Sequence, residues 1–161
     1  MANNAVTIAT VAEALLPGGV AGCSADNCKD LGNSMLSKGK VADAVWLYSL
    51  GLAKREGCQI LHSNRSAAHA KLMQWDDALR DADACIRVKP DWARGYGRRA
   101  AALEGKGRNA DALVCLEKVL ELDPGTASAQ AGIETLQKKL LADPQEPSWT
   151  ALGEFGGGGE G

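Results

Sequence analysis

Aromatic residues are scarce in this 161-residue chain: they make up 4% of the sequence, and phenylalanine occurs once. A β-sandwich favours aromatic and β-branched residues, whereas the alanine and leucine that are plentiful here suit packed helices. An excess of one charge is also missing, because the formal net charge is −2 at pH 7. A general nucleic-acid binder is more often strongly basic. The composition therefore favours an all-α domain and argues against DNA or RNA as a partner.

Targeting and membrane-spanning patterns are missing as well. Residues 1–28 contain no Lys or Arg, whereas a secretory signal begins with a positive region and a mitochondrial presequence is rich in arginine. The apolar stretch from Val6 to Leu16 includes Glu13 and is too short to span a bilayer. We therefore expect no membrane association and a cytoplasmic location.

The motifs of common catalytic and metal sites are also missing. No P-loop, G-x-S-x-G or H-E-x-x-H motif occurs, and "GYGRRA" matches a dinucleotide fingerprint without the preceding strand that this motif needs. Neither His62 nor His69 has catalytic or metal partners at a suitable spacing, and His62 is interpreted as a helix-packing residue. We therefore expect no enzymatic activity, no cofactor and no metal.

Cysteine occurs in an odd number and without any CxxC pair. This pattern does not have the spacing of zinc ligands, and it is typical of small core residues in a reducing compartment. The five cysteines are Cys23, Cys28, Cys58, Cys85 and Cys115.

An internal repeat organises the rest of the chain. Segments that start at Ala25, Gln59 and Ala93 are 34 residues apart and align without gaps. Positions 8 and 20 of each segment hold small residues, and a proline closes two of the three copies. A 34-residue period with this pattern is typical of the tetratricopeptide repeat, in which every copy is two helices. The small residues are Gly32, Ser66 and Ala100 at position 8, and Ala44, Ala78 and Ala112 at position 20.

The repeat predicts an all-α fold: a right-handed α-solenoid of three tetratricopeptide helix pairs plus a C-terminal capping helix. The first helices of the pairs are expected at 26–38, 59–72 and 93–105, the second at 41–54, 75–88 and 109–121, and the cap at 126–141. The corresponding domain, 25–142, divides into repeats 25–58, 59–92 and 93–126. We expect 1–24 to be a flexible segment with one helical turn near Val11–Leu16. We expect 143–161 to be a disordered Pro/Gly-rich tail, where Trp149 and Phe155 are candidates for a short linear motif.

Charge is divided unevenly between the two sets of helices. The first helices carry seven basic and three acidic residues, and the second helices carry four basic and eight acidic residues. The first helices line the concave side of such a solenoid, so we expect a basic groove and an acidic back. A concave surface of one sign raises the local concentration of ligands of the opposite sign.

The stretch "DWARGYGRRAA" indicates what the groove binds. Arg94 and Arg98 are four residues apart and repel each other on one helix face, and Gly95 and Gly97 weaken the helix further. A bound anion between the arginines would explain both costs, with the glycines leaving room at the groove wall. Five residues are expected to face one pocket: Lys29, Asn33, Asn64, Arg94 and Arg98. Amide donors, guanidinium forks and three positive charges suit a peptide's terminal carboxylate together with an acidic side chain.

The stretches "CKDLGNSML", "HSNRSAAHAK" and "KPDWARGYGRRAAALE" resemble the amino-terminal tetratricopeptide domain of the stress-inducible Hsp-organising co-chaperones, over residues 25 to 142. The resemblance implies a dicarboxylate clamp for the C-terminal Glu-Glu-Val-Asp of heat-shock protein 70 or 90. The matching positions are Lys29, Asn33, Asn64, Arg94 and Arg98, with Arg94 where the family usually has lysine. Arginine keeps the charge but changes the geometry. Upstream, the groove residues that follow from the resemblance are Leu36, Ala70, Lys71 and Glu104, which favour the 70 tail.

The hypothesis is therefore a monomeric, cytoplasmic co-chaperone adaptor of the stress response, with no nucleic-acid or membrane partner. We expect Leu36 and Ala70 to form an apolar pocket for the branched aliphatic residue that precedes Glu-Glu-Val-Asp in the 70 tail. Two alternatives remain open at this point. One is a general tetratricopeptide scaffold for another acidic peptide, and the other is a soluble receptor domain of an import machinery.

Overall fold

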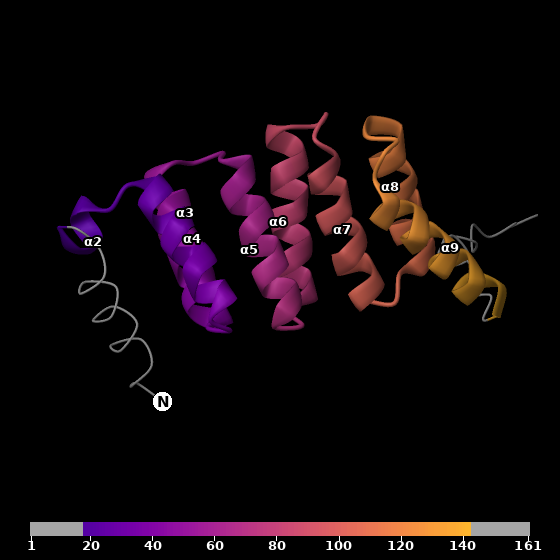
Figure 1. The fold of residues 1–161 in the computed structure, drawn as a ribbon, viewed down its shortest axis with the longest axis horizontal. Helices are drawn as coiled ribbons and strands as arrows, with labels where there is room; N and C mark the ends of the chain where they lie inside the picture. Colours follow the sequence, from indigo (N-terminus) through magenta and orange to yellow (C-terminus); the bar gives the residue numbers. More distant parts are fainter. Residues whose placement is uncertain (1–17, 143–161) are drawn as a thin grey trace, which may run out of the picture.

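Each 34-residue copy folds into two helices, and the copies stack in chain order (Figure 1). The computed structural model describes residues 18–142. The three pairs are α3 (Ala25–Ser37) with α4 (Val41–Lys54), α5 (Gln59–Lys71) with α6 (Trp75–Val88), and α7 (Ala93–Gly105) with α8 (Asn109–Leu122). The final helix α9 (Ala127–Ala142) packs on α8. No strand occurs within this described range, and none of its helices is long and apolar enough to cross a membrane.

The predicted helix bounds agree with the observed ones to within one residue. The helix α3 begins at Ala25, one residue earlier than predicted, because the Ser24 hydroxyl accepts a hydrogen bond from the Asn27 amide at 3.1 Å and caps the helix. At the other end, α8 continues through Leu122 before Pro124. The predictions for 143–161 and for a turn near Val11–Leu16 concern residues outside the described range.

The small residues at positions 8 and 20 mark the closest approach of the two helices within a copy. The Ser66 hydroxyl donates to the Ala78 carbonyl at 2.8 Å, so these two positions touch in the second copy. In the first copy, a Cβ added to Gly32 would lie 2.5 Å from the Tyr48 ring. All six residues of the two sets are buried. A larger side chain at any of them would separate the helix pair.

The tight turn inside each copy uses left-handed backbone at the same repeat position. Gly39 and Gly107 have φ of 74° in the first and third copies, and Met73 has φ of 58° in the second. Glycine adopts this conformation without steric cost, whereas a methionine does not. The side chain of Met73 is 71% exposed, so no burial offsets the strain.

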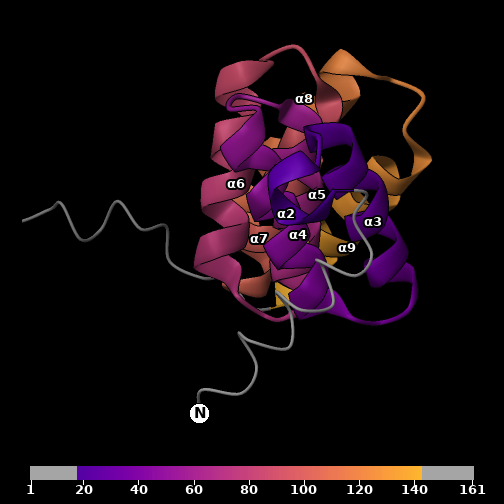
Figure 2. The same cartoon turned by 90° about the vertical axis from the view of Figure 1, so that its left-hand side faces the viewer.

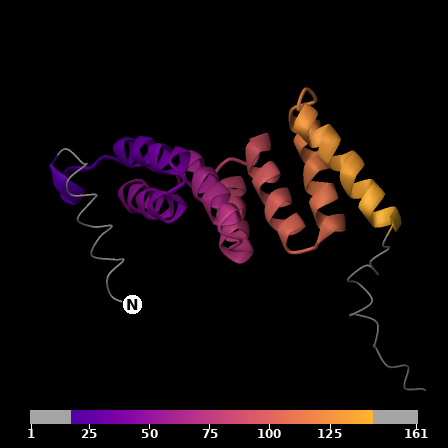
Figure 3. The same cartoon turned by 60° about the horizontal axis from the view of Figure 1, so that its bottom comes forward.

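The stack places the first helices of the pairs side by side. The helix α5 contacts α7 directly as well as its own partner α6, and Figures 2 and 3 show the layered arrangement end-on and tilted. Residues that recur at one position of the repeat therefore fall in one row across the stack. This geometry brings Lys29 and Asn33 of α3, Asn64 of α5 and Arg94 of α7 to neighbouring helices.

The stretch before α3 differs from the flexible segment that the sequence predicts for 1–24. A short helix, α2 (Gly19–Gly22), precedes Cys23, which is buried against Cys28 of α3. The physical reason is the open edge of the first copy, where Leu31 and Trp46 would otherwise face solvent. Terminal copies of a solenoid need such a cover.

Candidate functional site

Two asparagines from different copies meet at the groove. The Asn64 side-chain amide on α5 donates to Oδ1 of Asn33 on α3 at 3.1 Å. The same oxygen accepts a hydrogen bond from the Tyr48 hydroxyl at 2.7 Å. Tyr48 is fully buried, and burial raises its pKa to about 12, so the hydroxyl stays a donor at neutral pH. Because Oδ1 of Asn33 is doubly occupied, the Asn33 side chain offers its NH₂ group to a ligand.

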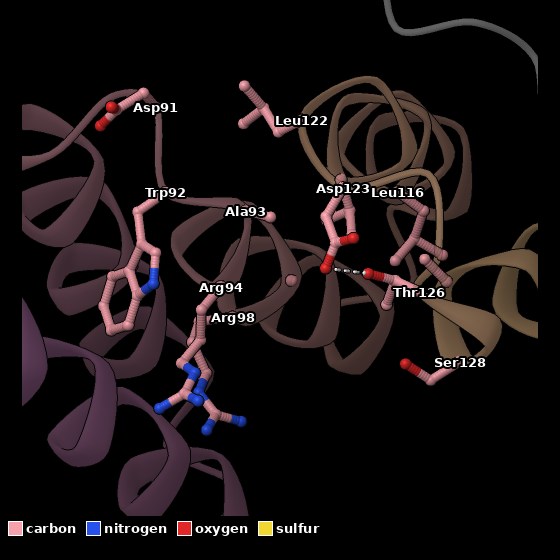
Figure 4. Close-up of a pocket in the computed structure, with 13 residues that line it drawn as sticks. Asp91, Trp92, Ala93, Arg94, Arg98, Leu116, Leu122, Asp123, Thr126 and Ser128 are labelled. Carbon is pink, nitrogen blue, oxygen red and sulfur yellow. Dashed lines mark hydrogen bonds between the residues drawn. The ribbon is translucent and has the colours of Figure 1, made fainter.

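Arg94 and Arg98 converge on one pocket. The pocket has a volume of about 610 Å³ and lies between α7 and the junction of α8 with α9. Figure 4 shows the two guanidinium groups side by side, beyond the same face of α7. Arg98 is half-buried, and its Nε donates to the Ser63 hydroxyl at 3.3 Å. Desolvation, and secondly the charge of Arg94, lowers the pKa of Arg98, yet an arginine stays charged in proteins.

The repulsion between these cations is not offset by an ion pair within the described residues, although Asp91 and Asp123 line the same pocket. Within residues 18–142, neither guanidinium forms an ion pair, whereas the adjacent Arg99 donates through Nε to Asp83 at 2.8 Å. Asp123, one of the two acidic residues of the lining, accepts a hydrogen bond from the Thr126 hydroxyl at 2.9 Å (Figure 4). The positive charges of Arg94 and Arg98 therefore favour the binding of an external anion in this pocket.

Trp92 forms the wall beside Arg94. The guanidinium carbon of Arg94 lies 5.1 Å from the centroid of the Trp92 ring, which is within cation–π range. Trp92 directly precedes α7 and lines the same pocket. A planar guanidinium stacks on an aromatic face, whereas an ammonium is a point charge. The arginine at this position is therefore oriented by the ring.

Lys29 lies one turn before Asn33 on α3 and is engaged locally. Its Nζ is 3.2 Å from Asp26 Oδ1 and 3.6 Å from Asp30 Oδ1. The hydrogen bond to Asp26, helped by the charge of Asp30, raises the pKa of Lys29. Exposed pairs of this kind are weak, so Lys29 can exchange them for a carboxylate in the groove.

A second pocket holds three of the four predicted upstream residues. Ala70 and Lys71 of α5 and Glu104 of α7 line a cavity of about 500 Å³. Trp75, Ala101 and Gly105 complete its lining. Leu36 is not part of this pocket, because it packs against the core of the first copy. The apolar wall comes from Trp75 instead.

The two glycines between the arginines have different roles. Gly97 lines the pocket, and a Cβ added there would meet only Val119, at 4.0 Å. A Cβ added to Gly95 would lie 3.0 Å from Ile86 of α6. The expectation that both leave room at the groove wall is therefore wrong for Gly95, which allows close packing of α7 on α6.

The predicted division of charge between groove and back also needs correction. Arg65 belongs to α5 but bonds to Asp81 of α6 through Nε and Nη2, both at 2.7 Å. Burial tends to raise the pKa of Asp81, but hydrogen bonds from His62 and Arg65 hold it below the usual range. Arg99 is used in the same way by Asp83. Two of the seven cations counted for the groove thus neutralise acids of the second helices.

The cysteines are core residues for the most part, as predicted. Four are buried, Cys58 is half-buried, and all five are free thiols. No group of three or more potential metal ligands occurs in the described part of the chain.

Comparison with known proteins agrees with this geometry, although no family model matches the chain. The Hsp70-Hsp90 organizing protein of Triticum aestivum is 40% identical over 121 residues, which is 75% of this chain and 21% of that protein. Heat shock protein STI1 of Saccharomyces cerevisiae is 32% identical over 125 residues, or 77% of this chain and 21% of that protein. The chain thus spans about a fifth of the length of these relatives.

Solved structures share the arrangement of helices over 71–73% of this chain. The first TPR of Spaghetti (RPAP3), bound to the HSP90 peptide SRMEEVD, has a TM-score of 0.71 at 26% identity and covers 73% of this chain and 93% of that one. The helices of this chain form a tetratricopeptide-repeat domain. The TPR2B domain of yeast Sti1, in its complex with pHsp70, has a TM-score of 0.67 at 25% identity, over 71% and 97% of the two chains.

Three aromatic residues of this tetratricopeptide-repeat domain were not assigned a role in the groove from the sequence. Tyr48 fixes the amide of Asn33, Trp92 orients Arg94, and Trp75 supplies the wall of the upstream pocket. Trp75 begins α6 and Trp92 directly precedes α7, whereas Tyr48 lies in the middle of α4. The role of each ring becomes clear only from its contacts in the folded structure.

Proposed function

We propose that this tetratricopeptide-repeat domain is a peptide-binding adaptor, not an enzyme, that grips the C-terminal Glu-Glu-Val-Asp tail of heat-shock protein 70. The clamp consists of Lys29, Asn33, Asn64, Arg94 and Arg98. The observation that carries the proposal is the pocket in which the guanidinium groups of Arg94 and Arg98 converge without an acidic partner among the described residues.

The geometry supports two carboxylates held close together. One carboxylate between Arg94 and Arg98 relieves their repulsion and receives charge-assisted hydrogen bonds. We expect a second carboxylate on the same terminal residue to be bound by Lys29 and by the amides that the Asn33–Asn64 hydrogen bond orients. These groups lie on α3 and α5, outside the lining of the pocket that holds Arg94 and Arg98. Hydrogen bonds to charged groups contribute about 1.5–3 kcal/mol each. Ordering the peptide on binding costs part of this free energy. We therefore expect micromolar affinity, which is a binding free energy of roughly −8 kcal/mol.

We expect the upstream pocket to discriminate between the heat-shock protein 70 and 90 tails. Ala70, Ala101 and the ring of Trp75 suit a branched aliphatic side chain, and Lys71 and Glu104 lie at the rim. Burying such a side chain contributes about 1.5–3 kcal/mol at most. We expect the 70 tail to be preferred by about tenfold, which is roughly 1.4 kcal/mol.

The heat-shock protein 90 tail is the second candidate. It is favoured by the similarity to the first TPR of Spaghetti, whose structure contains the HSP90 peptide SRMEEVD. Both tails share the residues that the clamp would read. The similarity to organising proteins supports a co-chaperone of the stress response. We propose that it acts as a monomer in the cytoplasm.

The test is calorimetric titration of the chain with a heat-shock protein 70 tail peptide and with a matched 90 peptide. We expect micromolar binding of both and tighter binding of the 70 peptide. A Lys71→Glu variant should reduce that preference, because the rim charge reverses. Arg87→Ala, which removes an exposed positive charge from α6 on the back, is the matched control and should change nothing. Absence of binding to either peptide would refute the proposal, and equal affinities would refute the role of the upstream pocket.

A further inference from the structure

Two cysteines meet where the chain enters the first copy. Cys23 follows α2 and Cys28 lies near the start of α3, and their Sγ atoms are 2.6 Å apart. The two side chains are buried, with 4% and 0% of their surface exposed, and both thiols are free. A disulfide has a sulfur–sulfur distance of about 2.05 Å. The two sulfur atoms therefore need to approach by only about half an ångström to bond.

The pair is at the centre of a small apolar contact that is separate from the peptide groove. Val20, Trp46 and Leu50 pack around the two sulfur atoms. These contacts hold α2 over the open edge of the first copy, where it serves as an N-terminal cap. The helix has only four residues, and so short a helix has no stability of its own. A hydrogen bond also connects α2 to the first copy, because the Lys54 Nζ donates to the Ala21 carbonyl at 3.4 Å.

We propose that Cys23 and Cys28 form a reversible intramolecular disulfide that fastens α2 to α3. The oxidant is a low-molecular-weight disulfide such as glutathione disulfide. The Cys23 thiolate attacks it, forms a mixed disulfide and releases one glutathione thiolate. The Cys28 sulfur then loses its proton to solvent and attacks the Cys23 sulfur, which expels the second glutathione thiolate. Two cysteine thiols are oxidised, and one glutathione disulfide is reduced to two glutathione molecules.

The order of the two attacks follows from where the thiols lie. Cys23 is in the irregular segment after α2, and opening of this short cap exposes it at low free-energy cost. Cys28 is within α3, and burial raises the pKa of its thiol to about 12, so it reacts only after the first step has displaced the cap. In a reducing compartment such a bond is transient, as is usual for intracellular disulfides with a regulatory role.

The sequence makes a direct chemical test possible. Because no Lys or Arg precedes Lys29, cleavage after basic residues leaves Cys23 and Cys28 together in the peptide 1–29. Cys58, Cys85 and Cys115 fall in three other peptides. The folded chain is incubated with glutathione disulfide, alkylated, digested and weighed. We expect the peptide 1–29 to be lighter by two hydrogen atoms and to carry no alkyl group, while the other three cysteines are alkylated. Two alkyl groups on this peptide, or a bond from either cysteine to another partner, would overturn the proposal.

Hydrogen exchange tests the consequence for the cap. In the oxidised chain, the backbone amides of α2 and of the start of α3 should exchange about tenfold more slowly than in the reduced chain, because the cap can no longer open. A Cys58→Ser variant, which keeps the pair, should behave like the original chain, and Cys23→Ser should show no difference between oxidising and reducing conditions. Equal exchange in the oxidised and reduced original chain would contradict the fastening of α2. That measurement requires no variant.

Discussion

Asn33 and Asn64 are joined by a hydrogen bond of 3.1 Å between α3 and α5, and the buried hydroxyl of Tyr48 bonds to the same Asn33 oxygen at 2.7 Å. The amide that faces the groove is thus held by a side chain that is fully buried. The amide donor of Asn33 and the Tyr48 hydroxyl that orients it can therefore be changed by separate substitutions.

Tyr48→Phe tests the orienting hydrogen bond. The ring stays in the core, so the free energy of unfolding should fall by only about 1 kcal/mol, the usual contribution of one hydrogen bond. Affinity for the tail peptide should fall several-fold, because the Asn33 amide is free to rotate. Urea unfolding and calorimetry measure the two effects. Tyr96→Phe is the control, since the Tyr96 hydroxyl bonds to the Pro90 carbonyl at 3.0 Å on the surface. Unchanged affinity in Tyr48→Phe would show that the hydroxyl has no role in the groove.

Trp92→Leu tests the stacking of Arg94. Loss of a cation–π contact of about 0.5–1 kcal/mol should weaken peptide binding by two- to fivefold, and Trp92→Phe should keep most of the affinity. In an Arg94→Ala background, Trp92→Leu should have no further effect, because the group that the ring orients is gone. Calorimetric titration of the two single variants and the double variant gives the coupling. An additive loss would mean that Trp92 acts independently of Arg94.

Met73→Gly tests the strained turn of the second copy. A non-glycine residue in left-handed backbone costs about 1 kcal/mol, and glycine gives back part of that through greater freedom in the unfolded chain. We expect a gain of about 0.5–1 kcal/mol in the free energy of unfolding, seen as a higher urea midpoint with an unchanged slope. The reverse change, Gly107→Met, should destabilise the third copy by a similar amount. A loss of stability in Met73→Gly would show that the exposed methionine makes a stabilising contact.

The carboxyl of Asp81 predicts a specific pH dependence. Its pKa is lowered from 3.8 in the folded state, so below that pH the unfolded chain binds a proton that the folded chain does not. The stabilising contribution is complete above pH 3.8 and is lost as the pH falls through the lower folded value.

Asp81→Asn should remove this acid-dependent loss and leave the half-buried Arg65 without its charge partner. Breaking a buried ion pair by removing one partner costs about 3 kcal/mol. Urea unfolding between pH 5 and pH 3 should therefore show a lower but flatter stability for the variant. Parallel curves for the two proteins would exclude Asp81 as the titrating group.

The helices could be predicted from the sequence because their signals are local or periodic. The 34-residue spacing gives the register, Ser24 caps α3, and Pro124 follows α8. In contrast, α2 has no periodic pattern, and it is held by the apolar contacts of Val20 and Cys23 with the first copy and by the hydrogen bond from Lys54 to Ala21.

The side-chain directions could be predicted only in part. Assigning a cation to a first helix does not give the face on which it lies. Arg65 and Arg99 both occupy position 7 of their copies and bond to acids of the second helix. Arg94 and Arg98, at positions 2 and 6, reach the pocket. Position 7 of the first copy is Leu31, which packs against the core. A comparison of the three copies therefore indicates that position 7 faces the second helix, whereas a count of charges per helix does not.

The central claim is that Arg94 and Arg98 hold a peptide carboxylate. The most direct measurement is calorimetric titration of the original chain and of Arg98→Ala with one tail peptide in two forms, the free acid and the C-terminal amide. Because burial lowers the pKa of Arg98, the folded state disfavours that charge, and Arg98→Ala should melt within a few degrees of the original chain. The original chain should bind the acid at least about tenfold more tightly, a difference of about 1.4 kcal/mol, and Arg98→Ala should lose most of this preference. Equal affinity of the original chain for the acid and the amide would contradict the claim.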